Sequence, residues 1–426
     1  MQILLIGAGG REHALAWKMC QSSLFGQLYI APGNAGTALL GKNIPIAVTD
    51  FNAMGNFCIE HNIDIVVVGP EEPLVLGIYD FFAADERLKH ITVVGPSKEG
   101  AKLEGSKAYA KAFMGRHHIP TATYREFDSN NFEEGIAYLQ ETAVPIVLKA
   151  DGLAAGKGVI ITSDRAEAIK EFEQMIQQSK FGDAGKKVVV ESFLKGLELS
   201  VFALTDGKSY VLLPEAKDYK RIGVGDTGLN TGGMGAISPV PFADKTFMDK
   251  VVARIVEPTV KGLADEGIVY QGFIFFGLIS VEGEPYVIEY NCRLGDPETE
   301  VVLPRLENDL LELFIALGRQ ELGTYTVEIA EKSAATVMAV SGGYPGAYEK
   351  GKQIIGLLQE QEEDVMVFQA GTKQQENDIV TDGGRVVAVT AMSDNIQKAV
   401  EKSIQKMESI SFEGMNFRND IGFEFM

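Results

Sequence analysis

The chain has 426 residues, with 39 lysines and arginines against 59 aspartates and glutamates, which gives a formal net charge of -20 at pH 7. A protein this acidic is not expected to bind nucleic acid through its phosphates. Hydrophobic residues make up 46% and charged residues 23% of the chain, which predicts a folded protein of two to four packed units.

The cysteines and the apolar segments indicate a reducing compartment. The three cysteines, Cys20, Cys58 and Cys292, lack the spacing of a disulfide framework or a zinc site. The first residues have the pattern of a strand and not of a signal peptide, and no apolar run approaches the length of a membrane span. We therefore expect a cytoplasmic protein with no membrane partner.

From residue 1 to about 105, short apolar segments alternate with helical ones. The predicted strands are buried and parallel, at 2–6, 27–31, 63–69 and 91–95. This pattern indicates a doubly wound α/β unit, which binds ligands beyond the carboxyl ends of its strands. Polar, glycine-rich loops follow three of the strands, at 7–12, 32–37 and 69–74. We expect these loops to meet at one edge of the sheet.

The first of these loops departs from the dinucleotide fingerprint G-x-G-x-x-G, because Glu12 stands where the last glycine is required. A nicotinamide oxidoreductase is therefore disfavoured. The strand, glycine turn and helix N-terminus that remain offer free N–H groups to a phosphate. A tight turn without any ligand is the alternative interpretation.

A helix is predicted from about 106 to 117, and two segments with nucleotide-binding character follow it. The strand 145–148 leads to Lys149 and a loop of small residues that contains Lys157. This loop is not a Walker A motif, because Gly158 replaces the required serine or threonine. We predict that backbone N–H groups and lysines hold phosphates there. A glycine-rich β-hairpin is the alternative.

The second segment, 188–198, is an apolar strand followed by a short linker and Glu198. Backbone groups of such a linker pair with a purine, and a carboxylate accepts from ribose hydroxyls. Glu198 as a solvated surface acid is the alternative.

The segment 286–293 carries the sharpest local signal. Side chains alternate along a strand, so Glu289, Asn291 and Arg293 share one face and Cys292 points into the core. Two oxygen ligands beside an arginine suit Mg²⁺ that is shared with nucleotide phosphates. A polar outer face is the alternative. The glycine-rich stretch 216–236 predicts a second contact with an anion or substrate.

Beyond about residue 331 the pattern becomes β-rich, and an amphipathic helix is predicted near 394–407. Several segments of the whole chain resemble ATP-grasp enzymes and, more closely, the family of phosphoribosylamine–glycine ligases. These segments are Gly9–Ala14, Ala31–Thr37, Leu103–Lys107, the Lys149 loop, Asn230–Ala236 and Asn291–Glu298.

The resemblance implies an α/β fold of three parts. The first, 1–105, is a doubly wound parallel-sheet domain for the substrate phosphate. The second, 106–325, is an ATP-grasp α+β module with a flexible lid at about 122–195. The third, 331–426, is a β-rich α+β domain.

The resemblance also implies the reaction, which belongs to de novo purine biosynthesis. ATP with Mg²⁺ or Mn²⁺ would convert glycine to glycyl phosphate, and the amine of 5-phosphoribosylamine would displace phosphate to give glycinamide ribonucleotide, ADP and phosphate. The expected assembly is a monomer.

The residues that carry these roles follow from the same resemblance. Those assigned to ATP are Lys107, Lys149, Gly156, Lys157, Gly158, Glu191, Ser192, Phe193, Leu194 and Glu198. Those assigned to the substrates are Gly9, Gly10, Arg11, Asn34, Gly36, Thr37, Glu71, Arg293 and Asp296. The metal ligands are Glu289 and Asn291, and the catalytic residues are Arg293, Lys149 and Asp218.

Two departures from the family pattern limit these assignments. Positions 216, 217 and 219 differ, so their roles stay open. The strand 272–277 carries no acid, so only two metal ligands are named. Another ATP-grasp carboxylate–amine ligase or carboxylase of purine metabolism is the nearest alternative, and a catalytically silent nucleotide-binding protein is a more distant one.

Overall fold

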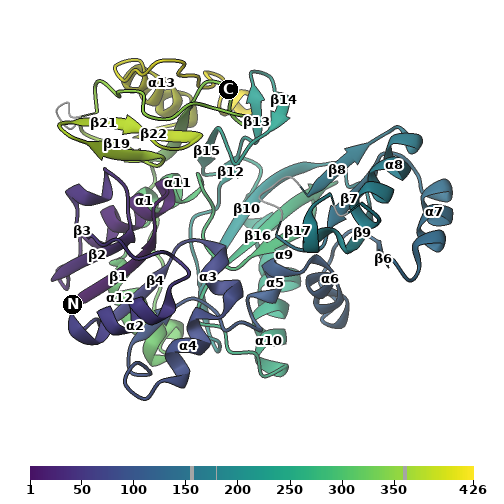
Figure 1. The fold of residues 1–426 in the computed structure, drawn as a ribbon, viewed down its shortest axis with the longest axis horizontal. Helices are drawn as coiled ribbons and strands as arrows, with labels where there is room; N and C mark the ends of the chain where they lie inside the picture. The colour runs from purple at the N-terminus through teal and green to yellow at the C-terminus, as the bar shows by residue number, and fades with distance from the viewer. Residues whose placement is uncertain (154–157, 179, 358–361) are drawn as a thin grey trace.

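The structure is a computed structural model that describes residues 1–153, 158–178, 180–357 and 362–426. Figure 1 shows the N-terminal unit in purple below the yellow C-terminal sheet, with a teal and green central region beside them. A smaller lobe that carries β6 to β9 extends from the central region to the right of the view.

The N-terminal unit is a five-stranded parallel sheet in the order β3-β2-β1-β4-β5. Its strands are β1 (Gln2–Gly7), β2 (Gln27–Pro32), β3 (Lys42–Asn43), β4 (Ile65–Val68) and β5 (Thr92–Val94), and its helices are α1 (Gly10–Met19), α2 (Phe51–Glu60), α3 (Glu71–Leu76) and α4 (Ile78–Ala84). The predicted doubly wound sheet is confirmed. The strand order reverses between β1 and β4, which is the point where such sheets bind ligands.

The central region contains two sheets. The lobe has the sheet β6-β9-β7-β8 and its own core around Phe127 and Phe172. The larger sheet has the order β11-β10-β16-β17. The lobe comprises β6 (Tyr124–Asp128), α7 (Phe132–Glu141), β7 (Ile146–Ala150), β8 (Val159–Thr162), α8 (Arg165–Ile176) and β9 (Lys187–Ser192), and the larger sheet comprises β10 (Leu197–Thr205), β11 (Tyr210–Leu212), β16 (Gly272–Val281) and β17 (Glu284–Asn291).

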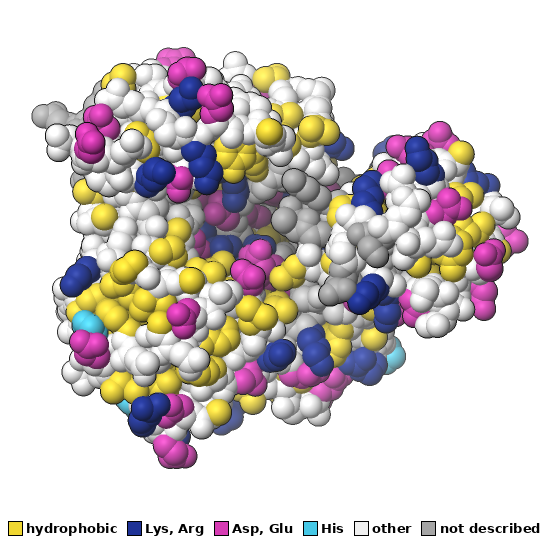
Figure 2. Space-filling view, in the orientation of Figure 1, with side chains coloured by type: hydrophobic (Ala, Val, Ile, Leu, Met, Phe, Trp, Pro, Cys, Tyr) yellow, Lys and Arg dark blue, Asp and Glu magenta, His cyan; other side chains and the backbone are white. Residues whose placement is uncertain are grey.

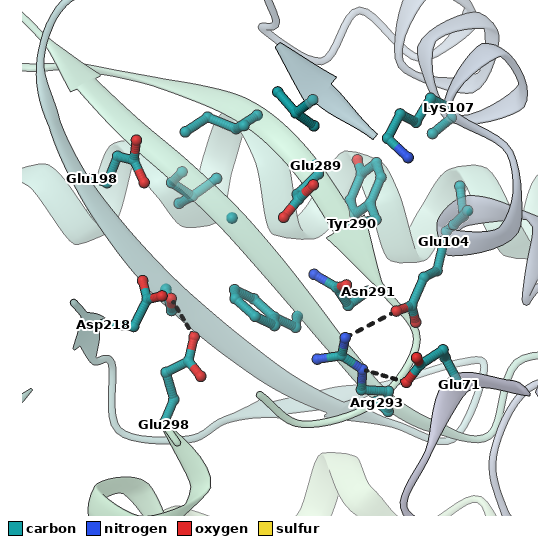
Figure 3. A pocket seen from close by; sticks show the side chains of 18 of the residues that line it. Glu71, Glu104, Lys107, Glu198, Asp218, Glu289, Tyr290, Asn291, Arg293 and Glu298 are labelled. Atoms are coloured by element: carbon teal, nitrogen blue, oxygen red, sulfur yellow. Dashed lines mark hydrogen bonds and ion pairs between the residues drawn. The ribbon is translucent and has the colours of Figure 1, made fainter. Parts of the chain in front are cut away.

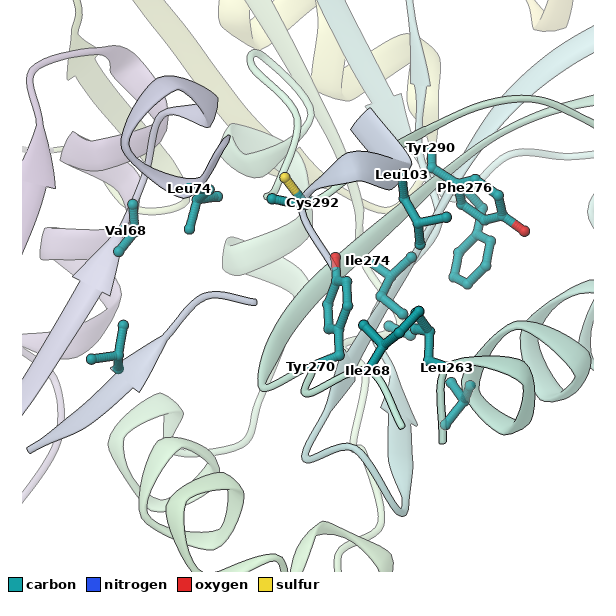
Figure 4. Packing of buried hydrophobic residues seen from close by; sticks show 14 of the residues in the cluster. Val68, Leu74, Leu103, Leu263, Ile268, Tyr270, Ile274, Phe276, Tyr290 and Cys292 are labelled. Atoms are coloured by element: carbon teal, nitrogen blue, oxygen red, sulfur yellow. The ribbon is translucent and has the colours of Figure 1, made fainter. Parts of the chain in front are cut away.

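One hydrophobic core joins the N-terminal unit to the larger central sheet. Val68 and Leu74 of the N-terminal unit belong to the same buried cluster as Ile274 and Phe276 of β16 (Figure 4). The helices that contribute to this core include α5 (Lys102–Gly105), α6 (Lys107–Arg116), α9 (Lys245–Val251) and α10 (Glu257–Asp265). Helices α11 (Thr299–Arg305) and α12 (Leu310–Arg319) contribute instead to a second core, which they share with β1 and β18. Side chains on the sheet edges between the two units are therefore held against a shared, packed base.

The C-terminal sheet has the order β12-β15-β18-β22-β19 and includes two strands from the middle of the chain. These are β12 (Lys217–Asp218) and β15 (Gly235–Ser238), which join β18 (Ser333–Val340), β19 (Val365–Gln369) and β22 (Arg385–Ser393). The amphipathic helix α13 (Ile396–Met407) packs on β18 and β22, as its apolar spacing predicts. Two hairpins complete the chain, β13 (Arg221–Gly223) with β14 (Thr227–Asn230) and β20 (Thr372–Gln375) with β21 (Asp378–Thr381).

In the parts of the chain that the structure describes, no helix combines the length and apolar composition needed to cross a membrane.

Candidate active site

A cavity of about 420 Å³ lies where the N-terminal unit, the central sheet, the lobe and the C-terminal sheet meet. Figure 2 shows the hollow between the main body and the lobe, where acidic and basic side chains gather. The charged residues of its wall are Arg11, Glu71, Glu104, Lys107, Lys111, Glu191, Glu198, Asp218, Lys220, Glu289, Arg293, Asp296, Glu298 and Arg385. A cavity with so many charges of both signs suits a highly charged ligand with bound cations.

Strand β17 places Glu289 and Asn291 in this wall (Figure 3). A β-bulge between β16 and β17 leaves Ile288 without a partner in the ladder, because Gly277 pairs with Glu289 and Leu278 with Val287. Tyr290 faces the opposite side, where its hydroxyl lies 2.8 Å from the Thr259 hydroxyl in the core. The predicted sharing of one face by Glu289 and Asn291 thus agrees with the strand geometry.

The two side chains fit a divalent cation in their chemistry. A carboxylate and an amide oxygen are the hard ligands that Mg²⁺ and Mn²⁺ accept. Across the described residues, no cluster of three or more His, Cys, Asp or Glu side chains is arranged to hold a metal. Two protein ligands leave the remaining coordination positions to water and phosphate oxygens, which is how Mg²⁺ is commonly held with nucleotides.

Arg293 is oriented by an acid that the sequence analysis missed. Its Nη2 lies 3.1 Å from Oε1 of Glu104, and its Nε lies 3.7 Å from Oε2 of Glu71 (Figure 3). Oε2 of Glu104 also accepts from the backbone N–H of Cys292 at 2.8 Å. Cys292 is buried, as predicted. Glu104 therefore fixes the backbone and the side chain of the same short segment.

Lys149 lies on β7 and is buried against Glu191. The Lys149 Nζ lies 3.0 Å from Oε1 of Glu191 and donates to the Ile288 carbonyl at 3.1 Å, which the bulge leaves available. Lys111 lies 3.1 Å from the same Glu191 oxygen, and burial lowers the pKa of Lys111 to about 8. Two lysines thus neutralise one carboxylate at the cavity wall. Lys111 has no signal in the sequence beyond its place in a helix.

Of the other residues assigned to ATP, some line the cavity and others lie outside its wall. Lys107, Gly158 and Glu198 line the cavity. Burial is the main cause that lowers the pKa of Lys107. Ser192 ends β9, and Phe193 and Leu194 begin the linker to β10; Phe193 is exposed, and Ser192 and Leu194 are partly exposed. The predictions for Gly156 and Lys157 lie outside the described residues.

Strand β12 carries Asp218 into the cavity opposite Glu298. Lys220 bridges Asp218 at 3.7 Å and Glu198 at 3.0 Å, and the Coulombic attraction of Lys220 is the main cause that lowers the pKa of Glu198. The Ser200 hydroxyl donates to Oε1 of Glu298 at 3.2 Å. Burial raises the pKa of Asp218 despite the nearby lysine. The sequence analysis did not select Lys220 or Glu298.

At the N-terminal edge, Arg11 lines the cavity and is bound by its neighbours. Its Nε lies 2.6 Å from Oε1 of Glu12, and its Nη1 donates to the Leu294 carbonyl at 3.2 Å. Glu12 also accepts from the backbone N–H of Gly9 at 2.5 Å. The Gly9 N–H is therefore satisfied within the turn, because Glu12, the residue that breaks the dinucleotide fingerprint, caps the helix.

Asn34, Gly36 and Thr37 hold their own loop together. The Asn34 Oδ1 accepts from the N–H groups of Gly36 and Thr37 at 2.8 and 2.9 Å. The Asn34 Nδ2 donates to the carbonyls of Ala8 and Gln369, at 2.9 and 2.8 Å, and so joins two N-terminal loops to the C-terminal sheet. In this structure these side chains shape the edge, while Arg11 and Glu71 reach the cavity.

Arg385 brings the C-terminal sheet into the site. Its Nη2 lies 3.0 Å from Oδ1 of Asp296, and its Nη1 donates to the carbonyls of Asp296 and Gly232 at 2.6 and 2.7 Å. Nothing near Arg385 in the sequence indicates this role, since its partners lie 89 and 153 residues away.

Glu300 is fully buried beside this cluster, and neither of its carboxyl oxygens has a hydrogen-bond partner among the described residues. Burial raises the pKa of Glu300 well above its usual value, and Asp296 adds to the rise. The folded state therefore holds this proton more tightly than the unfolded state, and stability is lost as pH rises above the pKa of a free glutamate.

We expect Glu300→Gln to raise the free energy of unfolding by about 1 kcal/mol at pH 8, because the amide keeps the shape without a buried charge. The gain should shrink as pH falls toward 5. Urea denaturation at both pH values measures it, with the exposed Glu401→Gln on α13 as the matched control. A loss of stability in Glu300→Gln at pH 8 would contradict the account.

The chain is similar to known proteins over nearly its whole length. Three family models of phosphoribosylglycinamide synthetase match it, the N domain at 1–104, the ATP-grasp (A) domain at 105–299 and the C domain at 334–424. The phosphoribosylamine–glycine ligases of Yersinia pestis and Vibrio cholerae are each 45% identical, over 99% of this chain and 98% of theirs.

Solved structures show the same architecture. A crystal structure of the phosphoribosylamine–glycine ligase of Thermotoga maritima matches with a TM-score of 0.85 and 34% identity, over 99% of this chain and 100% of that one. The biotin carboxylase domain of Hydrogenobacter thermophilus 2-oxoglutarate carboxylase matches with a TM-score of 0.73 and 17% identity, over 98% and 92%. That second likeness is one of fold alone. The predicted ATP-grasp architecture is confirmed.

Proposed function

The chain belongs to the phosphoribosylglycinamide synthetase family, and from this premise we propose that it joins glycine to 5-phosphoribosylamine with the use of ATP. A glycine carboxylate oxygen attacks the γ-phosphorus of ATP, and ADP leaves. The amine then attacks the carbonyl carbon of glycyl phosphate, and phosphate leaves as the amide forms. The product is glycinamide ribonucleotide, an intermediate of purine biosynthesis.

The observation that carries the proposal is the row of Glu289, Asn291 and Arg293 in one charged cavity with Lys107. Phosphoryl transfer mainly needs positioning and charge neutralisation. Lys107 and Arg293 supply fixed positive charge near the transferred group. Mg²⁺ or Mn²⁺, held by Glu289 and Asn291, supplies charge neutralisation at the phosphates when it is bound.

The remaining assignments divide the cavity between the substrates. Lys149, Glu191 and Glu198 stand on the side of the lobe and central sheet, and we assign them to ATP together with the β9–β10 linker. The N-terminal edge faces the other side, and we assign its loops to phosphoribosylamine. The residues on that edge are Gly9, Gly10, Arg11, Asn34, Gly36, Thr37 and Glu71, with Asp296 opposite. A monomer suffices for this arrangement, because one chain supplies every wall of the cavity.

An assay of ADP release tests the function. ATP, Mg²⁺, glycine and freshly generated phosphoribosylamine are supplied together, and each is omitted in turn. We expect ADP release to require glycine and glycinamide ribonucleotide to appear only with all four. ADP release that needs bicarbonate or formate in place of glycine would indicate a different ATP-grasp enzyme of purine metabolism.

A further inference from the structure

The two steps of the proposed reaction need different functional groups in the site. The first step transfers a phosphoryl group and needs positive charge. In the second, the amine nitrogen forms a bond to the carbonyl carbon of glycyl phosphate, and the bond from that carbon to the phosphate oxygen breaks with its electron pair on phosphate. The nitrogen must also lose one proton. A positioned carboxylate is a common acceptor for such a proton.

We propose that Glu298 is the catalytic residue that accepts the proton from the attacking amine, an inference that rests on the proposed function. Glu298 follows Arg293 by one tight turn and lines the same cavity, although only 3% of its surface is exposed. The reacting carbonyl must lie near Arg293, so the amine that attacks it comes within reach of the Glu298 side of the wall. After the amide forms, the proton passes from Glu298 to solvent as product leaves.

The local fold holds the Glu298 carboxyl in one place. The side chain folds back over Gly295, where an added Cβ would overlap the carboxyl group in its present position. The Ser200 hydroxyl donates to Oε1 at 3.2 Å from strand β10. In Figure 3 the carboxyl lies close to Asp218 and apart from the metal-ligand pair Glu289 and Asn291. The Glu298 carboxyl is therefore held in place by one side-chain hydrogen bond and lies away from the two proposed metal ligands.

The surroundings also give Glu298 a suitable basicity. Burial raises the pKa of Glu298 to about 7, and the carboxylate of Asp218 adds to the rise. A backbone hydrogen bond, Lys220 and Arg293 act in the opposite direction, and Glu300 is the further acid that faces it. A base with a pKa near the working pH is ionised often enough to accept a proton and basic enough to hold it.

Three other acids that line the cavity are paired with cationic side chains. Asp218 is bridged by Lys220, Asp296 is paired with Arg385, and Glu104 holds Arg293. Glu298, by contrast, accepts a hydrogen bond from a neutral hydroxyl, that of Ser200.

The test measures the two steps separately in the full chain. Glycine-dependent scrambling of ¹⁸O between the bridging and non-bridging positions of ATP reports glycyl phosphate formation. Glycinamide ribonucleotide formation reports both steps. We expect Glu298→Gln to lower product formation by about 100-fold or more and to leave scrambling within a few-fold of the unaltered enzyme. The exposed Glu307→Gln is the matched control and should change neither rate.

The pH profile separates a proton acceptor from a structural residue. In the unaltered enzyme, product formation should fall as pH drops below about 7, because Glu298 becomes protonated. Glu298→Gln should lose this acidic limb. Ser200→Ala removes a donor to the carboxylate, so it should move the limb to higher pH even if Glu298→Gln does not fold.

Three outcomes would overturn the inference: equal loss of scrambling and product formation in folded Glu298→Gln, an acidic limb that persists in that variant, or an unmoved limb in Ser200→Ala. If the unaltered enzyme releases no ADP with glycine, the proposed function fails instead.

Discussion

Glu289→Ala is expected to lower turnover by about three orders of magnitude while the fold stays intact. The substitution removes one of the two side chains on β17 that we propose as oxygen ligands of the metal, next to Arg293 in the cavity wall. A metal at phosphoryl transfer contributes several kcal/mol of charge stabilisation, and about 4 kcal/mol corresponds to a 1,000-fold change in rate. Removal of the carboxylate also takes one of three nearby negative charges away from Lys107, since Asp151 and Glu104 remain, so ATP phosphates should still be attracted.

The measurements are turnover at saturating Mg²⁺ and binding of Mn²⁺ to the complex with ADP, followed by electron paramagnetic resonance. Glu284→Ala is the matched control, because Glu284 lies on the same strand but pairs with Lys250 and Arg254 at its other end. That control should keep both properties. Near-normal turnover and Mn²⁺ binding in Glu289→Ala would remove Glu289 from the ligands.

The residues that sequence reasoning placed correctly are those whose geometry is local. The two-residue period of a strand puts Glu289 and Asn291 on one face whatever the rest of the fold does. The runs of branched apolar residues in the N-terminal unit indicate buried parallel strands, and the loops at their ends must then share an edge. Each of these features depends on residues within one element, so the sequence carries it directly.

The rest of the site comes from contacts that join distant segments. Glu104 reaches Arg293, Lys111 reaches Glu191, and Arg385 reaches Asp296 from the C-terminal sheet. A single lysine or acid in a helix looks the same whether it faces solvent or a cavity, because one charged residue barely changes the periodicity. The pairing of β12 with β15 carries Asp218 into the site. No sequence pattern predicts this pairing, because both strands are too short to show a period.

The N-terminal edge shows how a local motif is modified by its neighbours. A glycine turn before a helix predicts free N–H donors for a phosphate. Here Glu12 accepts from Gly9, and the same carboxylate pairs with Arg11, so the edge presents a guanidinium instead of the Gly9 donor. Arg11, with its charge directed to the cavity, is then the group best suited to an anion.

Arg11→Ala is expected to raise KM for phosphoribosylamine by about 10- to 100-fold and to leave the Kd for ATP nearly unchanged. A hydrogen bond to a charged group contributes about 1.5 to 3 kcal/mol, which corresponds to this range. ATP is assigned to the opposite wall, where Lys107 and Lys149 lie, so the loss of Arg11 should not reach it. Substrate kinetics and calorimetric titration with a non-hydrolysable ATP analogue measure the two effects.

A second substitution separates the effect of Arg11→Ala on substrate binding from its effect on stability. Arg11 contacts Glu12, and its removal leaves that carboxylate with the Gly9 N–H alone, so some loss of stability accompanies the substitution. The double variant Arg11→Ala with Glu12→Gln removes the unpaired charge and should recover stability but not the KM. Arg116→Ala, on the exposed end of α6, should change neither constant. A variant Arg11→Ala that loses ATP affinity and keeps its KM for phosphoribosylamine would show that this edge serves the nucleotide. The assignment of the two walls would then have to be reversed.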